Sequence, residues 1–319
     1  MVSPGSRAGA PAEGEKPGWP QGVGFVYLGL SPWEGMWKNR HQLMSRFAAE
    51  LPVLYVEPWQ WLRQLRLSPP SLSELVKDAR TPVVTVRHGG VRVFRSPAWL
   101  PVSGSSRARR VTLGLWLRRV RRAARACGIR YPVLWVSHPG MADVVGRMDE
   151  IFTIYHIVDE YTGYTGVCDV AGLADREQAL LDRVDLAIAV TPELIEARAR
   201  ADRQLLLVEN AVDYARFHTA VVDAAEPAAM AAIPRPRYGY SGLIGVRLDF
   251  GLLLEFARAS QERSLVLIGK VDPRGCEDAL AQLRALPNVH FLGEVPAAAV
   301  ASHVAAFDVG LLPYAINRE

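Results

Sequence analysis

RYGYSGLIGVRLDFGLLLEFARASQERSLVLIGK, residues 237–270, predicts a strand, a helix over about 249–262 and a second strand. The alternation continues through the strands NVHFLGE (288–294) and FDVGLLPY (307–314). Strands that alternate with helices are typical of a parallel sheet covered by helices, so this stretch predicts an α/β fold. The remaining helices of this half are expected near 275–286 and 296–306.

The first half of the chain shows the same alternation of strands and helices. Residues 82–95 interrupt it with a hairpin pattern that has Gly89 and Gly90 at its turn. The expected strands are GVGFVYLGL (22–30), PVLYVEP (52–58), YPVLWVSH (131–138), IFTIYHIVD (151–159), VDLAIAV (184–190) and LLLVEN (205–210). The expected helices lie near 35–50, 107–126, 140–148, 172–183 and 192–201.

Composition divides the chain into two α/β domains. Residues 1–20 are rich in Pro, Gly and Ala and lack a long apolar run, which predicts a disordered lead-in rather than a signal peptide. Residues 212–236 are rich in Ala and Pro, which predicts a linker between domains at 21–211 and 237–319. Doubly wound domains commonly have about five or six strands, so the few strands expected in 237–319 predict an incomplete second domain.

Overall composition limits the class of protein. Half of the 319 residues are hydrophobic, yet no apolar run reaches the roughly 18–20 residues that cross a bilayer. The cysteines Cys127, Cys168 and Cys276 form no disulfide framework, which predicts reduced thiols and a cytoplasmic protein. The net charge is +4, and no Asp or Glu occurs between Asp78 and Asp143. Such a basic region favours acidic partners: phosphorylated substrates, anionic lipid or nucleic acid.

Several classes of protein lack their motifs in this sequence. There is no G-x-G-x-x-G after a strand, no G-x-x-x-x-G-K-[ST] phosphate loop and no G-x-S-x-G elbow. These absences argue against a dinucleotide-dependent dehydrogenase, a P-loop NTPase and an α/β-hydrolase. His and Cys show no metal-ligand spacing, so neither a metal nor a cofactor is expected. The arginine-rich helix lacks a series of interleaved aromatic residues for base stacking, so nucleic acid is not an expected partner.

Seven segments in order resemble the GT-B glycosyltransferases of the group-1, GT4-like class, and within it the bacterial branch with a YDxVDD-type motif. The resemblance extends from about residue 22 to the end of the chain. The segments are IYHIVDEYTGY (154–164), VDLAIAVTPEL (184–194), VENAVDYARF (208–217), GYSGLIGVRLDF (239–250), LVLIGKVD (265–272), NVHFLGEVP (288–296) and FDVGLLPY (307–314).

The resemblance implies a GT-B fold, in which two Rossmann-like, doubly wound parallel-sheet domains face a cleft. It implies an N-terminal acceptor-side domain and a C-terminal domain that binds the donor nucleotide. The implied activity is the transfer of a hexose from a nucleotide diphosphate sugar to a glycan or lipid-linked acceptor. That transfer would be retaining and metal-independent, and it would serve the synthesis of cell-envelope polysaccharide.

Donor-binding candidates follow the strands of the second half. Gly242 and Gly245 permit a tight turn, Arg247 is placed to reach a phosphate, and Asp249 is expected to cap the next helix. An ordinary turn with a solvent-exposed arginine is the alternative. Two further groups follow strands where ligands bind in open α/β sheets. Taken alone, each is better explained by a residue without a role, a lysine on the side of a helix in the first group and a solvated loop carboxylate in the second. The groups are Gly269 with Lys270, and Glu294.

The segment YHIVDEY carries the catalytic candidates. Asp159 and Glu160 occupy the place where relatives have a His-Asp pair that faces the transferred sugar. Adjacent residues on a strand point to opposite faces, so only one of the two faces the ligand, and we assign Asp159. His156 is the second catalytic candidate, and the alternative for it is a histidine packed in the core.

Acceptor-binding candidates lie in SPWEGMWKNRHQ (31–42), after the first strand. The tryptophans offer stacking faces and the basic residues offer charge for an acidic acceptor. Packing of the tryptophans at the base of a helix is an equal alternative. The candidates are Trp33, Trp37, Lys38, Arg40 and His41.

The helix expected near 107–126 is amphipathic and basic. Such a helix binds anionic lipid at the inner face of a membrane, or else covers a sheet with its apolar face. The apolar residues of one face are Leu113, Trp116, Leu117, Val120 and Ala124. The arginines of the other are Arg118, Arg121, Arg122 and Arg125.

Relatives of this class carry a glutamate-rich segment shortly after the strand that corresponds to FDVGLLPY, and Glu319 is too close to that strand to replace it. The resemblance therefore implies that the 319-residue chain turns over poorly or not at all. Two alternatives to a transferase stay open. One is a nucleotide-sugar epimerase of the same fold, and the other is a nucleotide-binding module without catalysis.

Overall fold

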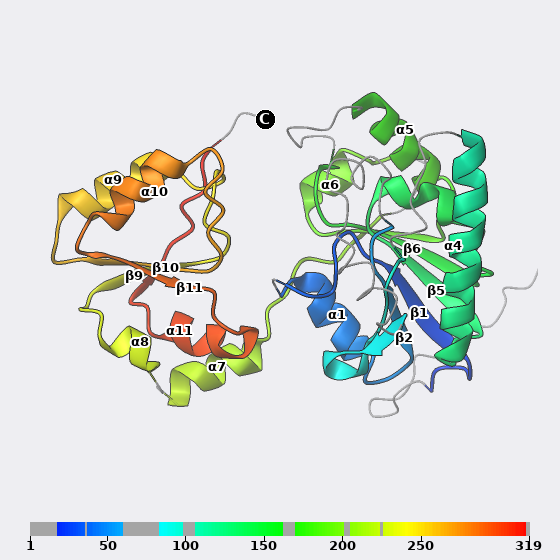
Figure 1. Ribbon diagram of the computed structural model, residues 1–319, viewed down its shortest axis with the longest axis horizontal. Helices are drawn as coiled ribbons and strands as arrows, with labels where there is room; N and C mark the ends of the chain where they lie inside the picture. The colour runs from blue at the N-terminus through cyan, green and yellow to red at the C-terminus, as the bar shows by residue number, and fades with distance from the viewer. Residues whose placement is uncertain are drawn as a thin grey trace, which may run out of the picture. The chain divides into compact units, whose positions relative to one another are not determined.

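The computed structural model describes residues 18–35, 37–59, 83–97, 106–161, 170–200, 205–223 and 226–316. Most of the predicted lead-in, residues 1–17, lies outside the described residues. The chain divides into two compact units, Met1–Asn210 and Ala211–Glu319, and each is described by itself. Figure 1 shows a helix-covered sheet in each unit, as the alternating pattern predicted.

The first unit contains an eight-stranded sheet in the order β3-β4-β2-β1-β5-β6-β7-β8. All neighbouring strands are parallel except β3, which pairs antiparallel with β4 and forms the predicted hairpin around Gly89 and Gly90. The strands are β1 Val23–Leu28, β2 Val53–Val56, β3 Val84–Val86, β4 Arg92–Phe94, β5 Tyr131–Val136, β6 Phe152–Ile157, β7 Leu186–Ala189 and β8 Leu205–Leu207.

The helices of the first unit follow the predicted order, with three shorter than expected. The helix expected near 35–50 spans only Asn39–Phe47. The helix expected near 140–148 is a shorter 3-10 segment. It ends at Val144, because Val145 is extended and Gly146, the next residue, has a positive φ angle. The helix expected near 192–201 ends at Glu196. The helical segments are α1 Asn39–Phe47, η1 His88–Gly90, α4 Ser106–Ala126, η2 Pro139–Val144, α5 Val170–Leu181 and α6 Pro192–Glu196.

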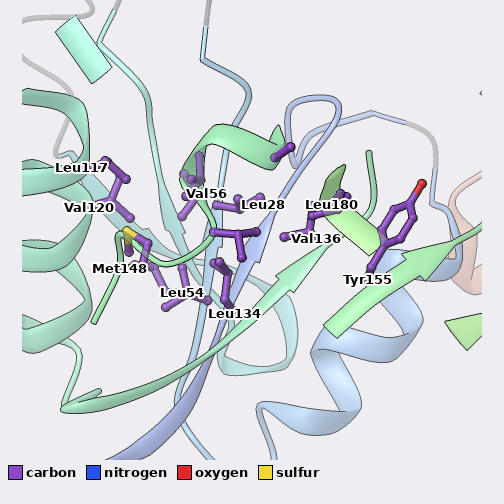
Figure 2. Packing of buried hydrophobic residues seen from close by; sticks show 14 of the residues in the cluster. Leu28, Leu54, Val56, Leu117, Val120, Leu134, Val136, Met148, Tyr155 and Leu180 are labelled. Atoms are coloured by element: carbon purple, nitrogen blue, oxygen red, sulfur yellow. The ribbon is translucent and has the colours of Figure 1, made fainter. Parts of the chain in front are cut away.

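Both faces of the first sheet are buried, as parallel sheets require. On one face the strands pack against α4, whose Leu117 and Val120 are fully buried with Leu134 of β5 (Figure 2). On the other face, aromatic residues such as Phe25 and Trp135 pack with Met44 of α1. Alternate residues along each strand therefore enter different cores.

The second unit contains a four-stranded parallel sheet in the order β11-β10-β9-β12. Its strands are β9 Arg237–Ser241, β10 Ser264–Ile268, β11 Val289–Gly293 and β12 Val309–Gly310. Its helical segments are α7 Tyr214–Asp223, α8 Ala228–Ala231, α9 Phe250–Ala259, α10 Glu277–Arg284, η4 Ala297–Ala299 and α11 Val300–Ala305.

The alternation along β10 divides the second core. Leu265 and Leu267 pack with α9 and α10, whereas Val266 and Ile268 pack on the opposite face with Met230 of α8. Figure 1 shows α9 and α10 on one side of this sheet and α8 and α11 on the other. The unit is therefore a three-layer α/β sandwich of the Rossmann-like kind.

The range 212–236, for which the sequence predicts a linker, differs from that expectation. It contains α7 and α8, it groups with the second unit, and α7 packs against α11. Asp213 accepts a hydrogen bond from the Arg216 backbone N–H (3.4 Å) and so caps α7. Met230 and Ile233 are buried against the sheet. The Ala-rich composition thus belongs to short packed helices.

Candidate functional site

In the second unit, the loops that follow β9 and β10 run side by side. The Ile244 N–H donates to the Lys270 carbonyl (2.9 Å), and the Asp272 N–H donates back to the Ile244 carbonyl (2.8 Å). Closer to the strands, the Gly242 N–H donates to the carbonyl of Ile268 at the end of β10 (2.9 Å). These bonds extend the parallel pairing past the strand ends and fix both loops at the carboxyl edge of the sheet.

Glycines allow these backbones to approach each other. A Cβ on Gly269 would overlap the Gly242 carbonyl, and the Gly269 φ of +135° is itself unfavourable for other residues. A Cβ on Gly245 would lie 3.2 Å from the Asp272 carbonyl. Gly293, at the end of β11, has a φ of +70° and open space where its Cβ would be, and its carbonyl accepts from the Gly269 N–H (2.7 Å).

Charged side chains border this glycine-lined edge. Arg247, Lys270 and Glu294 are exposed and follow β9, β10 and β11 respectively. The structure therefore brings all six predicted donor-binding residues to one edge of one sheet. Asp272, which the sequence did not single out, lies in the same loops: the hydrogen bond from Arg274 lowers its pKa to about 2, and the charge of Lys270 adds to the shift.

The predicted cap of α9 is confirmed. The Asp249 carboxylate accepts a hydrogen bond from the Leu252 N–H (2.9 Å) at the first turn. The chain after β12 also borders this loop, because the Asp249 N–H donates to the Pro313 carbonyl and the Ala315 N–H donates to the Arg247 carbonyl, both at 2.9 Å. Arg247 therefore projects from a loop that is held on both sides.

In the first unit, His156 lies within β6 and is buried. Its ring meets the Trp135 ring edge-on, with 5.6 Å between centroids. Burial lowers the pKa of His156 to about 4, so the imidazole is neutral at pH 7. This geometry fits the alternative of a packed core histidine and gives no support to the predicted catalytic role.

Asp159 and Glu160 follow β6 and are both half-buried. Glu160 forms an ion pair with Arg198 (3.0 Å), and Arg198 also pairs with buried Glu177 (3.0 Å). The Glu177 carboxylate in turn accepts a hydrogen bond from the Tyr155 hydroxyl (2.6 Å). Burial would lower the pKa of Arg198, but the two carboxylates raise it, so the guanidinium stays charged. Glu160 thus belongs to an ion-pair network, which leaves Asp159 as the candidate carboxylate.

Three residues that follow the neighbouring strands β5 and β6, as Asp159 does, were missed from the sequence. The Tyr161 hydroxyl donates to the Ser137 carbonyl (2.8 Å), and the His138 ring meets the Tyr161 ring with 4.7 Å between centroids. His138 Nδ1 accepts from the Gly140 N–H (2.9 Å), so Nε2 carries the proton, and burial lowers the pKa of His138. A signal was present, because Ser137 and His138 are the two residues that follow the strand YPVLWV (131–136).

Two of the five acceptor-binding candidates are buried. His41 is fully buried in α1; its Nδ1 accepts from the Lys38 N–H (2.9 Å), so its Nε2 donates to the Trp33 carbonyl (2.8 Å). Burial lowers the pKa of His41, so the ring is uncharged. Trp33 is buried against Tyr55, with 5.0 Å between ring centroids. The packing alternative therefore holds for both, and His41 supplies no charge to an acceptor.

The other three candidates are more accessible. Trp37 is half-buried and stacks on the His41 ring at 4.9 Å. Arg40 is half-buried and reaches the Pro32 carbonyl (3.4 Å). Lys38 is exposed at the start of α1. Trp37, Lys38 and Arg40 remain candidates for contact with an acceptor.

The described residues contain neither a metal-binding cluster nor a helix that could span a membrane. No group of three or more His, Cys, Asp or Glu side chains in this part of the chain is arranged to hold a metal ion. Across the same residues, every helix is too short or too polar to traverse a bilayer.

Comparison with known proteins places the fold. No family model and no curated protein matches the chain. Among solved structures, sucrose-phosphate synthase from Thermosynechococcus elongatus matches with a TM-score of 0.60 and 17% identity, over 91% of this chain and 75% of that one. The fold is GT-B. The HepE protein of Anabaena, solved with UDP and glucose, matches with a TM-score of 0.58 and 14% identity, over 90% and 73% of the two chains.

A third GT-B neighbour is the α,α-trehalose 6-phosphate synthase of Burkholderia multivorans. Its TM-score is 0.50 at 12% identity, and the match covers 91% of this chain and 77% of that one. At these identities the likeness is one of fold. The predicted α/β class with Rossmann-like parallel sheets is therefore confirmed, whereas the GT4-like branch stays a prediction.

Proposed function

We propose that this chain is a glycosyltransferase that moves a hexose from a nucleotide diphosphate sugar to a glycan or lipid-linked acceptor. We place it in the GT4-like class and assign it a retaining mechanism without a metal. The observation that carries the proposal is the carboxyl edge of the second sheet. There, three strand ends carry closely packed glycine backbones beside Arg247 and Lys270.

The chemistry of transfer explains why such an edge suits the donor. The bond between the sugar and the diphosphate breaks, and negative charge develops on the leaving phosphate. Exposed cations and accessible backbone N–H groups stabilise that charge, and glycines permit the backbone to come close to it. We therefore assign Arg247 and Lys270 to the diphosphate and Glu294 to the nucleoside.

The first unit supplies the acceptor side in this proposal. Asp159 is the carboxylate that we assign to the transferred sugar, because Glu160 is committed to Arg198. His138 follows β5, the strand next to β6, and its protonated Nε2 suits hydrogen bonding to a sugar hydroxyl. Trp37 and Lys38 provide a stacking face and a charge for the acceptor.

Binding of the donor nucleotide is the first test. Calorimetric unfolding of the chain in UDP, GDP or ADP should show stabilisation by one nucleotide, about 2.7 kcal/mol at 100 times its Kd. The matching nucleotide sugar should bind at the same site and compete with that nucleotide. If none of the three nucleotides or their sugars shifts the transition, the donor site is absent and the proposal fails.

A further inference from the structure

Helix α4 presents a regular exposed stripe that runs along its length. The stripe consists of residues spaced so that all lie within one narrow sector of the helix, opposite the face that packs on the first sheet. Each of them is exposed, and we call the set the outer stripe. Its members are Arg107, Val111, Leu115, Arg118, Arg122 and Arg125.

Positive charge dominates the helix around the outer stripe. The helix has no acidic residue, and further arginines flank the stripe at Arg110 and Arg119. Its acidic neighbours face its sides: Asp143 pairs with Arg109 (2.5 Å), and Asp149 pairs with Arg121 (3.2 Å) and Arg125 (3.4 Å). Within the described part of the chain, no carboxylate pairs with Arg107, Arg118 or Arg122. Asp149 therefore neutralises Arg125 in part, while the other three arginines of the stripe carry charge that no described carboxylate neutralises.

Two apolar side chains lie inside this charged stripe. Val111 is 63% exposed and Leu115 is 43% exposed, although the opposite face of the same helix buries Leu113 and Leu117 almost completely. Neither exposed side chain contributes to the core. The phosphate backbone of a nucleic acid has no apolar surface to contact Val111 and Leu115. The boundary between lipid headgroups and acyl chains accepts apolar side chains and also binds cations at its phosphates.

We propose that the outer stripe of α4 binds an anionic membrane surface, with Val111 and Leu115 entering the headgroup region and the arginines contacting lipid phosphates. Charge complementarity selects an anionic leaflet. The inference does not rest on glycosyl transfer, because lipid binding is measured without donor or acceptor. It accords with a lipid-linked acceptor, which would reach the enzyme at that surface.

Vesicle co-sedimentation of the whole chain tests this inference. Vesicles of phosphatidylcholine with phosphatidylglycerol should retain the protein, pure phosphatidylcholine vesicles should not, and added salt should weaken retention. Each basic residue near an anionic surface raises partitioning roughly five-fold, so R118Q/R122Q should lower it by about twenty-five-fold. R258Q/R284Q is the matched control, because it removes the same charge from exposed positions on α9 and α10.

A second variant separates lipid from nucleic acid. V111S/L115S keeps every charge and should reduce vesicle retention, while leaving any binding to polyuridylate unchanged. The inference is overturned if the wild-type chain does not bind anionic vesicles. It is also overturned if R118Q/R122Q and R258Q/R284Q reduce vesicle retention by the same factor. It is equally overturned if V111S/L115S binds vesicles as well as the wild type does.

Discussion

The carbonyl oxygen of Gly242 occupies the position that a side chain on Gly269 would need. This contact holds the ends of β9 and β10 together and forms the floor of the edge that we assign to the donor. The Gly269 backbone also has a φ of +135°, which is unfavourable for any residue with a Cβ. A glycine is therefore required at position 269 both for the close packing of the two backbones and for the shape of the candidate site.

Replacement of Gly269 by alanine should destabilise the second unit. The added Cβ must displace the β9 loop and adopt a strained φ, which together should cost about 2 kcal/mol or more of unfolding free energy. Urea unfolding followed by far-UV circular dichroism measures the change. Gly310→Ala is the control, because nothing lies within 4 Å of its added Cβ, and it should leave the midpoint unchanged. Equal stability of the two variants would contradict this account.

Arg198 should be essential to the stability of the first unit. Its side chain is only 6% exposed, and Arg198→Met would leave the buried Glu177 carboxylate without its cation, at a cost of about 3–5 kcal/mol. All eight tryptophans lie between Trp19 and Trp135, so tryptophan fluorescence during urea unfolding reports this unit alone.

The double variant R198M/E177Q is the control for that loss. It removes the stranded charge, while the amide oxygen introduced by Glu177→Gln can still accept from the Tyr155 hydroxyl, so it should recover much of the stability. If the double variant is as unstable as the sum of its single substitutions, Arg198 acts by packing and not by charge.

The elements of the fold were predictable because they depend on local pattern. A continuous apolar run such as VLYV (53–56), which is buried at every position, indicates a strand covered on both faces, and neighbouring residues also indicate the cap at Asp249. The helices in 212–236 were not predicted, because the Ala- and Pro-rich composition indicates a linker while the helical spacing of the apolar residues indicates a helix. Asp213 followed by YARFHTAVVD is a capped amphipathic helix, and that signal was available in the sequence.

The candidate site was less predictable because its chemistry depends on partners distant in sequence. The choice between Asp159 and Glu160 is made by Arg198, far along the chain, and no local pattern shows that pairing. The burial of His41 depends on a nearer partner, the Trp33 carbonyl, but the contact forms only because the loop between them folds back over the start of α1. The glycines at the strand ends were identifiable, since they follow predicted strands directly.

Acid should destabilise the first unit through His156. Its pKa in the folded state, about 4, lies below the unfolded value near 6.5, so the unfolded state binds more protons as the pH falls. The associated stability is fully present above pH 6.5 and is lost progressively toward pH 4, by up to about 3 kcal/mol. Urea unfolding between these pH values, read by tryptophan fluorescence, measures the slope.

His156→Phe should flatten that pH dependence while it preserves the ring contact with Trp135. Part of the slope should remain, because burial also lowers the pKa of His41 and His138 in the same unit. A variant whose stability falls with acid as steeply as that of the wild type would show that His156 does not carry the effect.

Lys270 and Arg247 should each contribute to nucleotide affinity if the edge of the second sheet binds a diphosphate. Hydrogen bonds to charged groups contribute about 1.5–3 kcal/mol, so Lys270→Gln or Arg247→Gln should weaken binding roughly ten- to hundred-fold. Both side chains are exposed, so thermal stability without ligand should stay the same. Arg258→Gln is the matched control, because it removes an exposed charge from the last turn of α9, which leads to the opposite edge of the sheet. Calorimetric titration with the nucleotide that stabilises the chain gives the three constants. Equal affinities for the three variants would move the diphosphate away from this edge, even if the nucleotide still binds.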